Sequence, residues 1–100
     1  MSVSRRSSRH YGGVASYSVF IKTSASKELE AVEPRGVRIR IASRIQALAR
    51  TPRPAGSQKL AGESEHFRIR QGAYRIVYAV HDERRIVEVI KIGHRRDVYR

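Results

Sequence analysis

Arginines alternate with apolar residues in the last third of the chain, which is the pattern of a strand with one basic face. In residues 67–70, Phe-Arg-Ile-Arg, Arg68 and Arg70 project from the same face because side chains alternate along a strand. The next apolar run, residues 73–81, carries Arg75. A guanidinium is planar and binds phosphate through two parallel hydrogen bonds. The pattern therefore predicts a sheet face suited to binding phosphate groups.

The charge balance of the whole chain favours a polyanionic partner. Lys and Arg number 21 against nine Asp and Glu, which gives a formal net charge of +12 and an isoelectric point near 11.2. No stretch is long enough to span a bilayer, and no helix pairs a wide apolar face with a lysine-rich one, so nucleic acid is favoured over a membrane. The alternatives are an acidic protein partner and a basic surface that serves solubility alone.

The composition also indicates the cellular compartment and the number of domains that we expect. One hundred residues allow one domain with a modest two-layer core. The absence of cysteine excludes disulfides and thiolate metal sites, and no apolar secretory segment opens the chain, so we expect a cytoplasmic protein. Residues 1–16 are rich in serine and arginine and poor in apolar residues. We expect them to form a flexible basic tail ahead of a domain at residues 17–100.

Two elements are expected near the start of this domain, a strand of the sheet and a short helix. Residues 17–22 have the β-branched and aromatic composition of a buried first strand. A short helix over residues 25–32 follows, with Thr23 or Ser24 as its cap and Glu28 within its first turns, where the helix dipole favours an acid. This helix ends before Pro34.

A second helix over residues 35–50 has a clear apolar stripe. The stripe should pack on the sheet, and at helical spacing it comprises Val37, Ile41, Ile45 and Leu48, extended by Ala42 and Ala49. Its arginines, Arg38, Arg44 and Arg50, are interpreted as ordinary polar coverage of an amphipathic helix. Ile39 falls on the opposite side, where contact with the first helix is the one role we can give it.

The remaining segments complete a six-element fold. Prolines at positions 52 and 54 end the second helix, and a loop runs to residue 65, with Leu60 expected to plug the core. Strands over residues 67–70, 73–81 and 86–92 follow. The expected fold class is α+β, with the order β-α-α-β-β-β and two helices packed on one face of a small, mainly antiparallel sheet.

Short motifs over residues 17–100 resemble one protein family in their order and spacing. The most specific are Pro52-Arg53-Pro54 with Lys59-Leu60-Ala61-Gly62, then residues 67–70, then Tyr74-Arg75-Ile76-Val77-Tyr78, and last Gly93-His94-Arg95-Arg96-Asp97-Val98-Tyr99. Together they resemble the RelE type of toxin from the RelE/ParE superfamily of toxin–antitoxin pairs. The resemblance covers nearly the whole expected domain, and implies a RelE-like fold.

The resemblance implies an endoribonuclease that enters the ribosomal A site and cuts messenger RNA until an antitoxin neutralises it. Arg68 and Arg70 match a pair of basic residues beside the scissile phosphate, and Arg75, Arg95 and Tyr99 match further residues of the family's site. In the implied reaction the RNA 2′-hydroxyl attacks the adjacent phosphate, which requires no metal and no cofactor. The implied partners are a RelB-like antitoxin, the ribosome and messenger RNA. Operator DNA would be bound only through the antitoxin complex.

The identity of the general base departs from the family pattern. Well-known relatives have lysines where this chain has Arg68 and Arg70, and a guanidinium does not lose its proton in proteins. His94 is a candidate base, because its ordinary pKa suits proton transfer near neutrality. Tyr99 is a candidate acid or a platform on which a nucleobase stacks.

Two other functions remain open for a chain of this pattern. One is a ParE-like toxin that inhibits DNA gyrase, although such chains generally lack this set of basic residues and tyrosine. The other is an inactive relative that represses its operon together with its antitoxin. The replacement of lysine by arginine at positions 68 and 70 keeps the second alternative open.

Overall fold

The computed structural model describes residues 8–10, 17–60, 62 and 65–94. In chain order its elements are β1 (Ser8–His10), β2 (Ser18–Lys22), α1 (Thr23–Glu30), α2 (Arg35–Ala47), β3 (Gln58–Lys59), β4 (His66–Gln71), β5 (Tyr74–His81) and β6 (Ile86–His94). The six strands form one sheet in the order β1-β2-β6-β5-β4-β3. Only β2 and β6 run parallel, and every other neighbouring pair is antiparallel.

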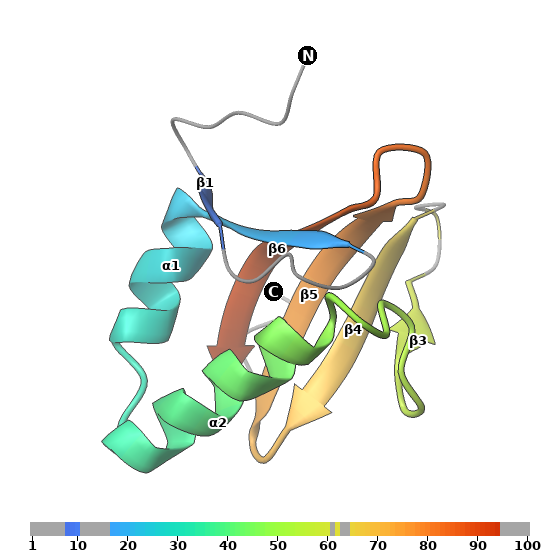
Figure 1. Cartoon of the computed structure of the whole chain (residues 1–100). Coiled ribbons are helices and arrows are strands. Elements are labelled where there is room, and N and C mark those ends of the chain that lie inside the picture. The colour runs from blue at the N-terminus through green and yellow to red at the C-terminus, as the bar shows by residue number, and fades with distance from the viewer. Residues whose placement is uncertain (1–7, 11–16, 61, 63–64, 95–100) are drawn as a thin grey trace.

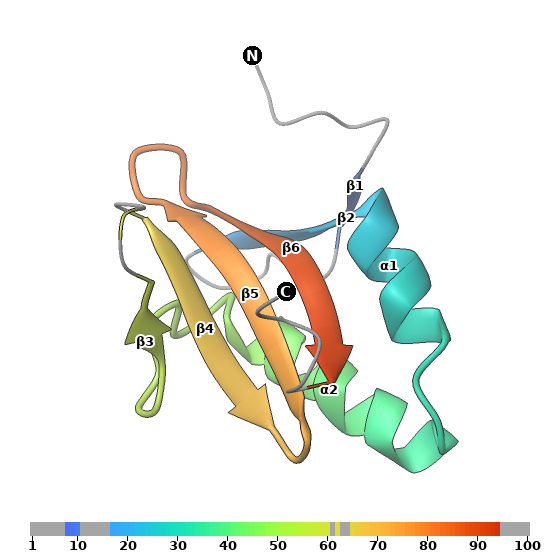
Figure 2. The same ribbon diagram turned by 180° about the vertical axis from the view of Figure 1, so that it is seen from behind.

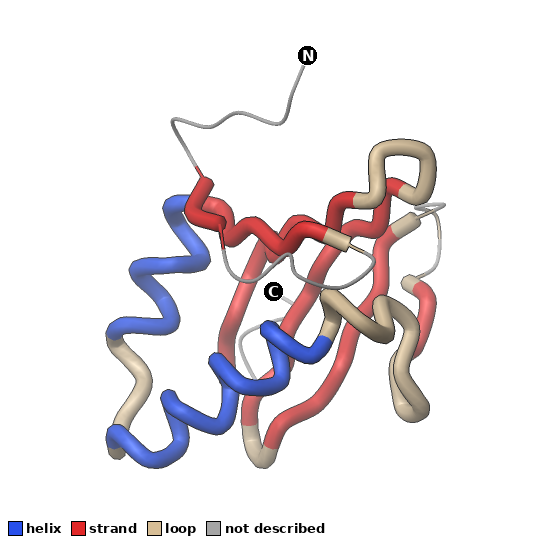
Figure 3. Tube along the Cα trace, in the orientation of Figure 1, coloured by secondary structure: helices blue, strands red, loops and turns tan. Residues whose placement is uncertain are grey.

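Both helices lie on the same side of this sheet (Figures 1 and 3), and the view from behind shows the strands in front of α2 (Figure 2). The predicted fold class is therefore confirmed. The core lies between the sheet and the helices, because alternate residues of each strand point toward the helices. In β2 the buried residues are Val19 and Ile21, and in β4 they are Phe67 and Ile69.

The apolar stripe of α2 packs on the sheet as its spacing predicted. Ile41, Ile45 and Leu48 are all fully buried, and Val37 packs against the core from its edge. The helix itself ends at Ala47, and Leu48 continues the stripe from the turn that follows. Ile39 is 53% exposed, so the expected contact with α1 does not cover it.

Helix α1 differs from the prediction at its start. It begins at Thr23, so Lys22 is its cap and no side chain accepts a hydrogen bond there. Glu28 does not interact with the first turn. Its carboxylate instead accepts a hydrogen bond from the Ile92 N–H (2.8 Å) and pairs with Lys91 (3.1 Å). The pairing of β2 with β6 ends at Val89, so Glu28 covers the edge of β6 beyond that point.

Two short strands, β1 and β3, were not predicted. Residues 8–10 were assigned to a flexible tail, whereas the structure pairs them with Phe20, Ile21 and Lys22 of β2. Edge pairing uses backbone groups, so a segment poor in apolar side chains can still join a sheet. The other residues of the expected tail lie outside the described residues. Leu60, expected to plug the core, is only half-buried and is not among the core residues.

Candidate nucleic-acid interface

The register of β4, β5 and β6 brings three of the predicted site residues to one face of the sheet. Arg70 lies directly opposite Arg75, and Arg75 lies opposite Gly93. Directly opposed residues of antiparallel strands share a face. This is the face turned away from the helices, because Ile69 and Ile76 between them are buried in the core. Arg68 projects from the same face two residues along β4.

The three arginines differ in how far they are covered. Arg70 is exposed, Arg68 is half-buried, and Arg75 is 9% exposed. Gly93, which lies directly opposite on β6, places no side chain beside Arg75. The three cations of this face therefore differ in their access to solvent, from the exposed Arg70 to the buried Arg75.

Gln58 is a site residue that the sequence analysis missed. It lies opposite Arg68 in the pairing of β3 with β4, and its Oε1 accepts a hydrogen bond from Nη2 of Arg68. This contact orients one guanidinium of the basic face. No local pattern marks Gln58, since β3 is two residues long and both of its side chains are exposed.

A pocket of about 260 Å³ opens beside these residues at the edge of β4. It is lined by Arg44, Gly56, Gln58, Arg68 and Arg70. Arg44 comes from α2, where the sequence analysis interpreted it as polar coverage of the helix. Within the described part of the chain, neither Arg44 nor Arg70 forms an ion pair. In the described part of the chain, two of the arginines that line the pocket, Arg44 and Arg70, are thus not neutralised by a carboxylate.

The structure does not bring His94 to this face. His94 lies opposite Tyr74, and their rings meet edge-on with centroids 5.7 Å apart. Tyr74 packs against the core, and His94 lines a second pocket together with Glu28 and Val32 of the α1 region. His94 is therefore on the helix side of the sheet. Arg95 and Tyr99, the two other predicted site residues, lie outside the described residues.

A β-bulge explains why His94 lies on the helix side of the sheet. Val77 pairs with Lys91, but the next residue, Tyr78, pairs with Val89, so Ile90 is an extra residue in β6. Strict alternation from Val87 and Val89 would turn His94 outward. The extra residue shifts the alternation by one position, so Ile92 is buried and His94 follows it onto the helix side.

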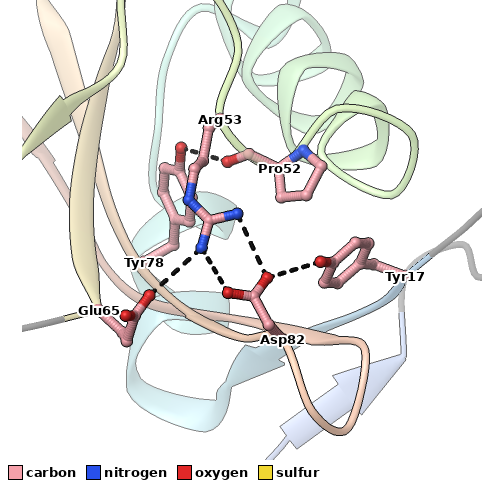
Figure 4. Close-up of polar contacts among 6 residues, drawn as sticks. All are labelled: Tyr17, Pro52, Arg53, Glu65, Tyr78 and Asp82. Atoms are coloured by element: carbon pink, nitrogen blue, oxygen red, sulfur yellow. Dashed lines mark hydrogen bonds and ion pairs between the residues drawn. The ribbon is translucent and has the colours of Figure 1, made fainter.

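A polar cluster around Arg53 holds the loop that carries Gly56 and Gln58 (Figure 4). The Arg53 guanidinium donates to Asp82 (2.7 Å) and Glu65 (3.3 Å), and lies 5.2 Å from the ring centroid of Phe67. Tyr17 donates to the same carboxylate of Asp82 at 2.6 Å. The Pro52-Arg53-Pro54 motif therefore serves as an anchor for the loop, away from the basic face.

Tyr78 fixes the same loop from inside the core. Its ring is fully buried and stacks on Phe67, with ring centroids 5.8 Å apart, and its hydroxyl donates to the Pro52 carbonyl at 2.8 Å. Burial raises the pKa of Tyr78 to about 12. Hydrogen bonds from Arg53 hold the pKa of Asp82 below its usual range, and the bond to Asp82 raises the pKa of Tyr17.

Among the described residues, His, Asp and Glu side chains form no group of three that could hold a metal ion. The longest described helix, α2, has 13 residues, and no described helix is long and apolar enough to cross a membrane.

The fold and the basic face define a small α+β protein whose arginine-bearing sheet is backed by two helices. The family model described as the ParE toxin of type II toxin–antitoxin systems, parDE, matches residues 19–99. The chain belongs to this family, within the RelE/ParE superfamily, and is a type II toxin.

Individual relatives are toxins named RelG and RelE and a RelBE2 complex. Toxin RelG of Mycobacterium tuberculosis is 32% identical over 87 residues, which are 84% of this chain and 97% of the relative. The isolated RelE toxin of E. coli superposes with a TM-score of 0.68 at 28% identity, covering 80% of this chain and 84% of that one. The RelBE2 toxin–antitoxin complex of M. tuberculosis superposes with a TM-score of 0.67 at 28% identity, covering 84% of this chain and 97% of that one.

Proposed function

We propose that this toxin is a ribosome-dependent endoribonuclease that cleaves messenger RNA in the A site and so inhibits translation. The observation that carries the proposal is the convergence of Arg68, Arg70 and Arg75 on one sheet face. The similarity to the E. coli RelE toxin and to Toxin RelG supports it. Arg95 and Tyr99 belong to the proposed site through the family resemblance.

The proposed reaction depends on cations beside the scissile phosphate. The RNA 2′-oxygen forms a bond to the adjacent phosphorus, and the bond from phosphorus to the 5′-oxygen breaks. The products are a 2′,3′-cyclic phosphate and a free 5′-hydroxyl, with the proton passing from the 2′-hydroxyl to the leaving oxygen. Charge accumulates on the phosphate in the transition state, and preorganised cations stabilise it there. Arg75, buried on the same face as Arg68 and Arg70, suits this role.

None of the three arginines can accept the 2′-proton, because the guanidinium pKa lies above about 12. His94 lies on the other side of the sheet, so its proposed role as the base loses its geometric support. Tyr99 is the remaining candidate of the family site for proton transfer or for stacking on a base. Arginines at positions 68 and 70 are consistent with electrostatic stabilisation, and the ribosome would orient the reacting groups.

A cognate antitoxin completes the proposal. Several of the similar structures are toxin–antitoxin complexes, among them RelBE2 of M. tuberculosis and RelBE of E. coli. We propose a RelB-like partner with an acidic segment that covers the basic face of Arg68, Arg70 and Arg75 and the pocket beside it. Operator DNA would be contacted through that complex.

The test is cleavage of labelled messenger by purified toxin on programmed ribosomes. Arg70→Gln should lower the cleavage rate by roughly 10²-fold to 10³-fold, the cost typical of removing one transition-state donor. Arg70 is exposed, so thermal unfolding should be unchanged. Arg35→Gln, which removes the same charge from the exposed start of α2, is the matched control. Cleavage that is insensitive to Arg70→Gln, or wild-type reactions without cyclic-phosphate ends, would contradict the proposal.

Inhibition of DNA gyrase is the second candidate, because the matching family model is that of the ParE toxins. A supercoiling assay with purified gyrase distinguishes the two. Inhibition of gyrase without messenger cleavage would establish the second candidate. Neither activity, in a protein that still binds its antitoxin and operator DNA, would identify an inactive relative that acts in repression.

A further inference from the structure

Arg44 reaches from α2 to the edge of the sheet, where β4 has no neighbouring strand. β3 pairs with β4 only at Phe67 and Arg68, so the backbone of Arg70 lies beyond that pairing. Nη2 of Arg44 donates to the Arg70 carbonyl at 3.4 Å. A helix side chain is thereby placed next to the basic face of the sheet.

The pocket at this edge has the size and lining of an anion site. Its volume of about 260 Å³ is below the range of roughly 300–1,000 Å³ that is typical for drug-sized ligands. Of the five described residues that line it, three are arginines and none is a carboxylate. Gln58 adds a side-chain amide, and Gly56 adds backbone with open space around its Cα. A phosphate group fits this lining better than an apolar ligand or a cation does.

The protein itself holds Arg44 only weakly. The 3.4 Å contact is well beyond the usual 2.9–3.0 Å for N–H···O bonds. Nε of Arg44 is buried and has no hydrogen-bond acceptor among the described residues, which is energetically costly. Arg53, by contrast, is fixed by Asp82 and Glu65. An anion that drew the Arg44 guanidinium toward the pocket would relieve this cost.

We propose that Arg44, in the pocket beside Arg68 and Arg70, binds an RNA phosphate adjacent to the scissile one that those two arginines face, at the free edge of β4. This inference rests on the proposed nuclease function and adds a residue to it. The RNA backbone would pass from the outer face of the sheet around this edge toward α2. Arg44 is then a positioning residue. It contributes to substrate affinity and leaves the chemical step to the residues on the sheet face.

The experiment measures binding and cleavage separately. The probe is a short, fluorescently labelled, unstructured single-stranded RNA. Its affinity for the toxin is measured by fluorescence anisotropy at salt concentrations between about 50 and 300 mM, a range that includes the physiological ionic strength of about 0.15 M. Each phosphate contact on a single strand contributes about 0.7 to the slope of log affinity against log salt concentration. Arg44→Gln should lower this slope by about 0.7, and Arg44→Lys should largely preserve it.

Arg35→Gln is the matched control, because it removes the same charge from the same helix. Nine residues separate the two positions, or about 13 Å along a helix axis, which exceeds the Debye length of about 8 Å at physiological salt. Arg35→Gln should change the slope by less than Arg44→Gln does. Equal slopes for the two variants would overturn the proposal.

On ribosomes, Arg44→Gln should raise KM for messenger cleavage and leave kcat near the wild-type value. A fall in kcat at unchanged KM would overturn the positioning role. If wild-type toxin fails to cleave but Arg44→Gln still lowers the salt slope selectively, the nuclease proposal fails and the phosphate site stands. If Arg44→Gln unfolds, Gln58→Glu places a carboxylate in the same pocket. It should weaken RNA binding, and unchanged binding would count against the site.

Discussion

Replacing Tyr78 with phenylalanine tests how the core holds the loop beside the basic pocket. The substitution keeps the buried ring and its stacking on Phe67 but removes the hydroxyl that donates to the Pro52 carbonyl. A net hydrogen bond contributes about 0.5–1.5 kcal/mol, and an acceptor left half-buried without its donor adds to the loss. We expect the free energy of unfolding to fall by about 1–2 kcal/mol. For a domain of this size Tm should fall by about 4–8 °C per kcal/mol.

The pH dependence of the same variant provides an independent check. The pKa of Tyr78 is about 12 in the folded protein and about 10 in the unfolded chain. Because the folded value is the higher one, the stabilisation linked to a neutral Tyr78 is complete below pH 10 and is lost as the pH rises toward 12. Two pKa units correspond to about 2.7 kcal/mol. The stability advantage of the wild type over Tyr78→Phe should therefore shrink between pH 10 and pH 12.

Urea unfolding followed by circular dichroism at pH 8, 10, 11 and 12 measures both effects. Tyr74→Phe is the control, because it removes the same group from the start of β5 and leaves the contact between Tyr78 and Pro52 intact. Equal stability of wild type and Tyr78→Phe at pH 8 would show that the hydroxyl does not hold the loop. Parallel stability profiles up to pH 12 would show that Tyr78 titrates with an ordinary pKa.

Three further predictions concern the elements that position the site. Asp82→Asn should remove an acid-sensitive contribution to stability: the folded pKa of Asp82 is lowered, so its stabilisation is present above its ordinary pKa and is lost as the pH falls through the folded value. Urea titrations from pH 7 to pH 3 check this, with Glu83→Gln as the control. Glu28→Ala should cost about 1–2 kcal/mol because the Ile92 N–H loses its acceptor, and Glu28→Gln should cost less, as urea unfolding would show. Ile45→Ala should cost about 2–5 kcal/mol by opening a cavity under α2, and a change below 1 kcal/mol in the same assay would contradict the packing.

The amino-acid sequence was sufficient to predict the features that depend on the spacing of apolar residues within one strand or helix. Phe67 and Ile69 alternate with Arg68 and Arg70, and burying the apolar pair necessarily turns the arginines outward. The helical spacing of Ile41, Ile45 and Leu48 similarly determined which side of α2 faces the sheet. These features depend on residues close in sequence, so they could be predicted before any long-range contact was known.

Other features of the site could not be predicted, because they depend on the register between strands. His94 lies on the helix side because a single bulge opposite Val77 and Tyr78 shifts the alternation of β6. Gln58 meets Arg68 because two residues of a loop pair with β4. A one-residue shift of register reverses every side chain beyond it, and no local pattern records such a shift.

The sequence by itself determined the fold class, the excess of positive charge and the basic face of β4. Only the tertiary structure placed Arg44 beside Arg70 and turned His94 away from the arginines. The reason is that alternation and helical period are properties of neighbouring residues. The packing of α2 against the free edge of β4 joins residues 26 positions apart, and its geometry arises only when the core is assembled.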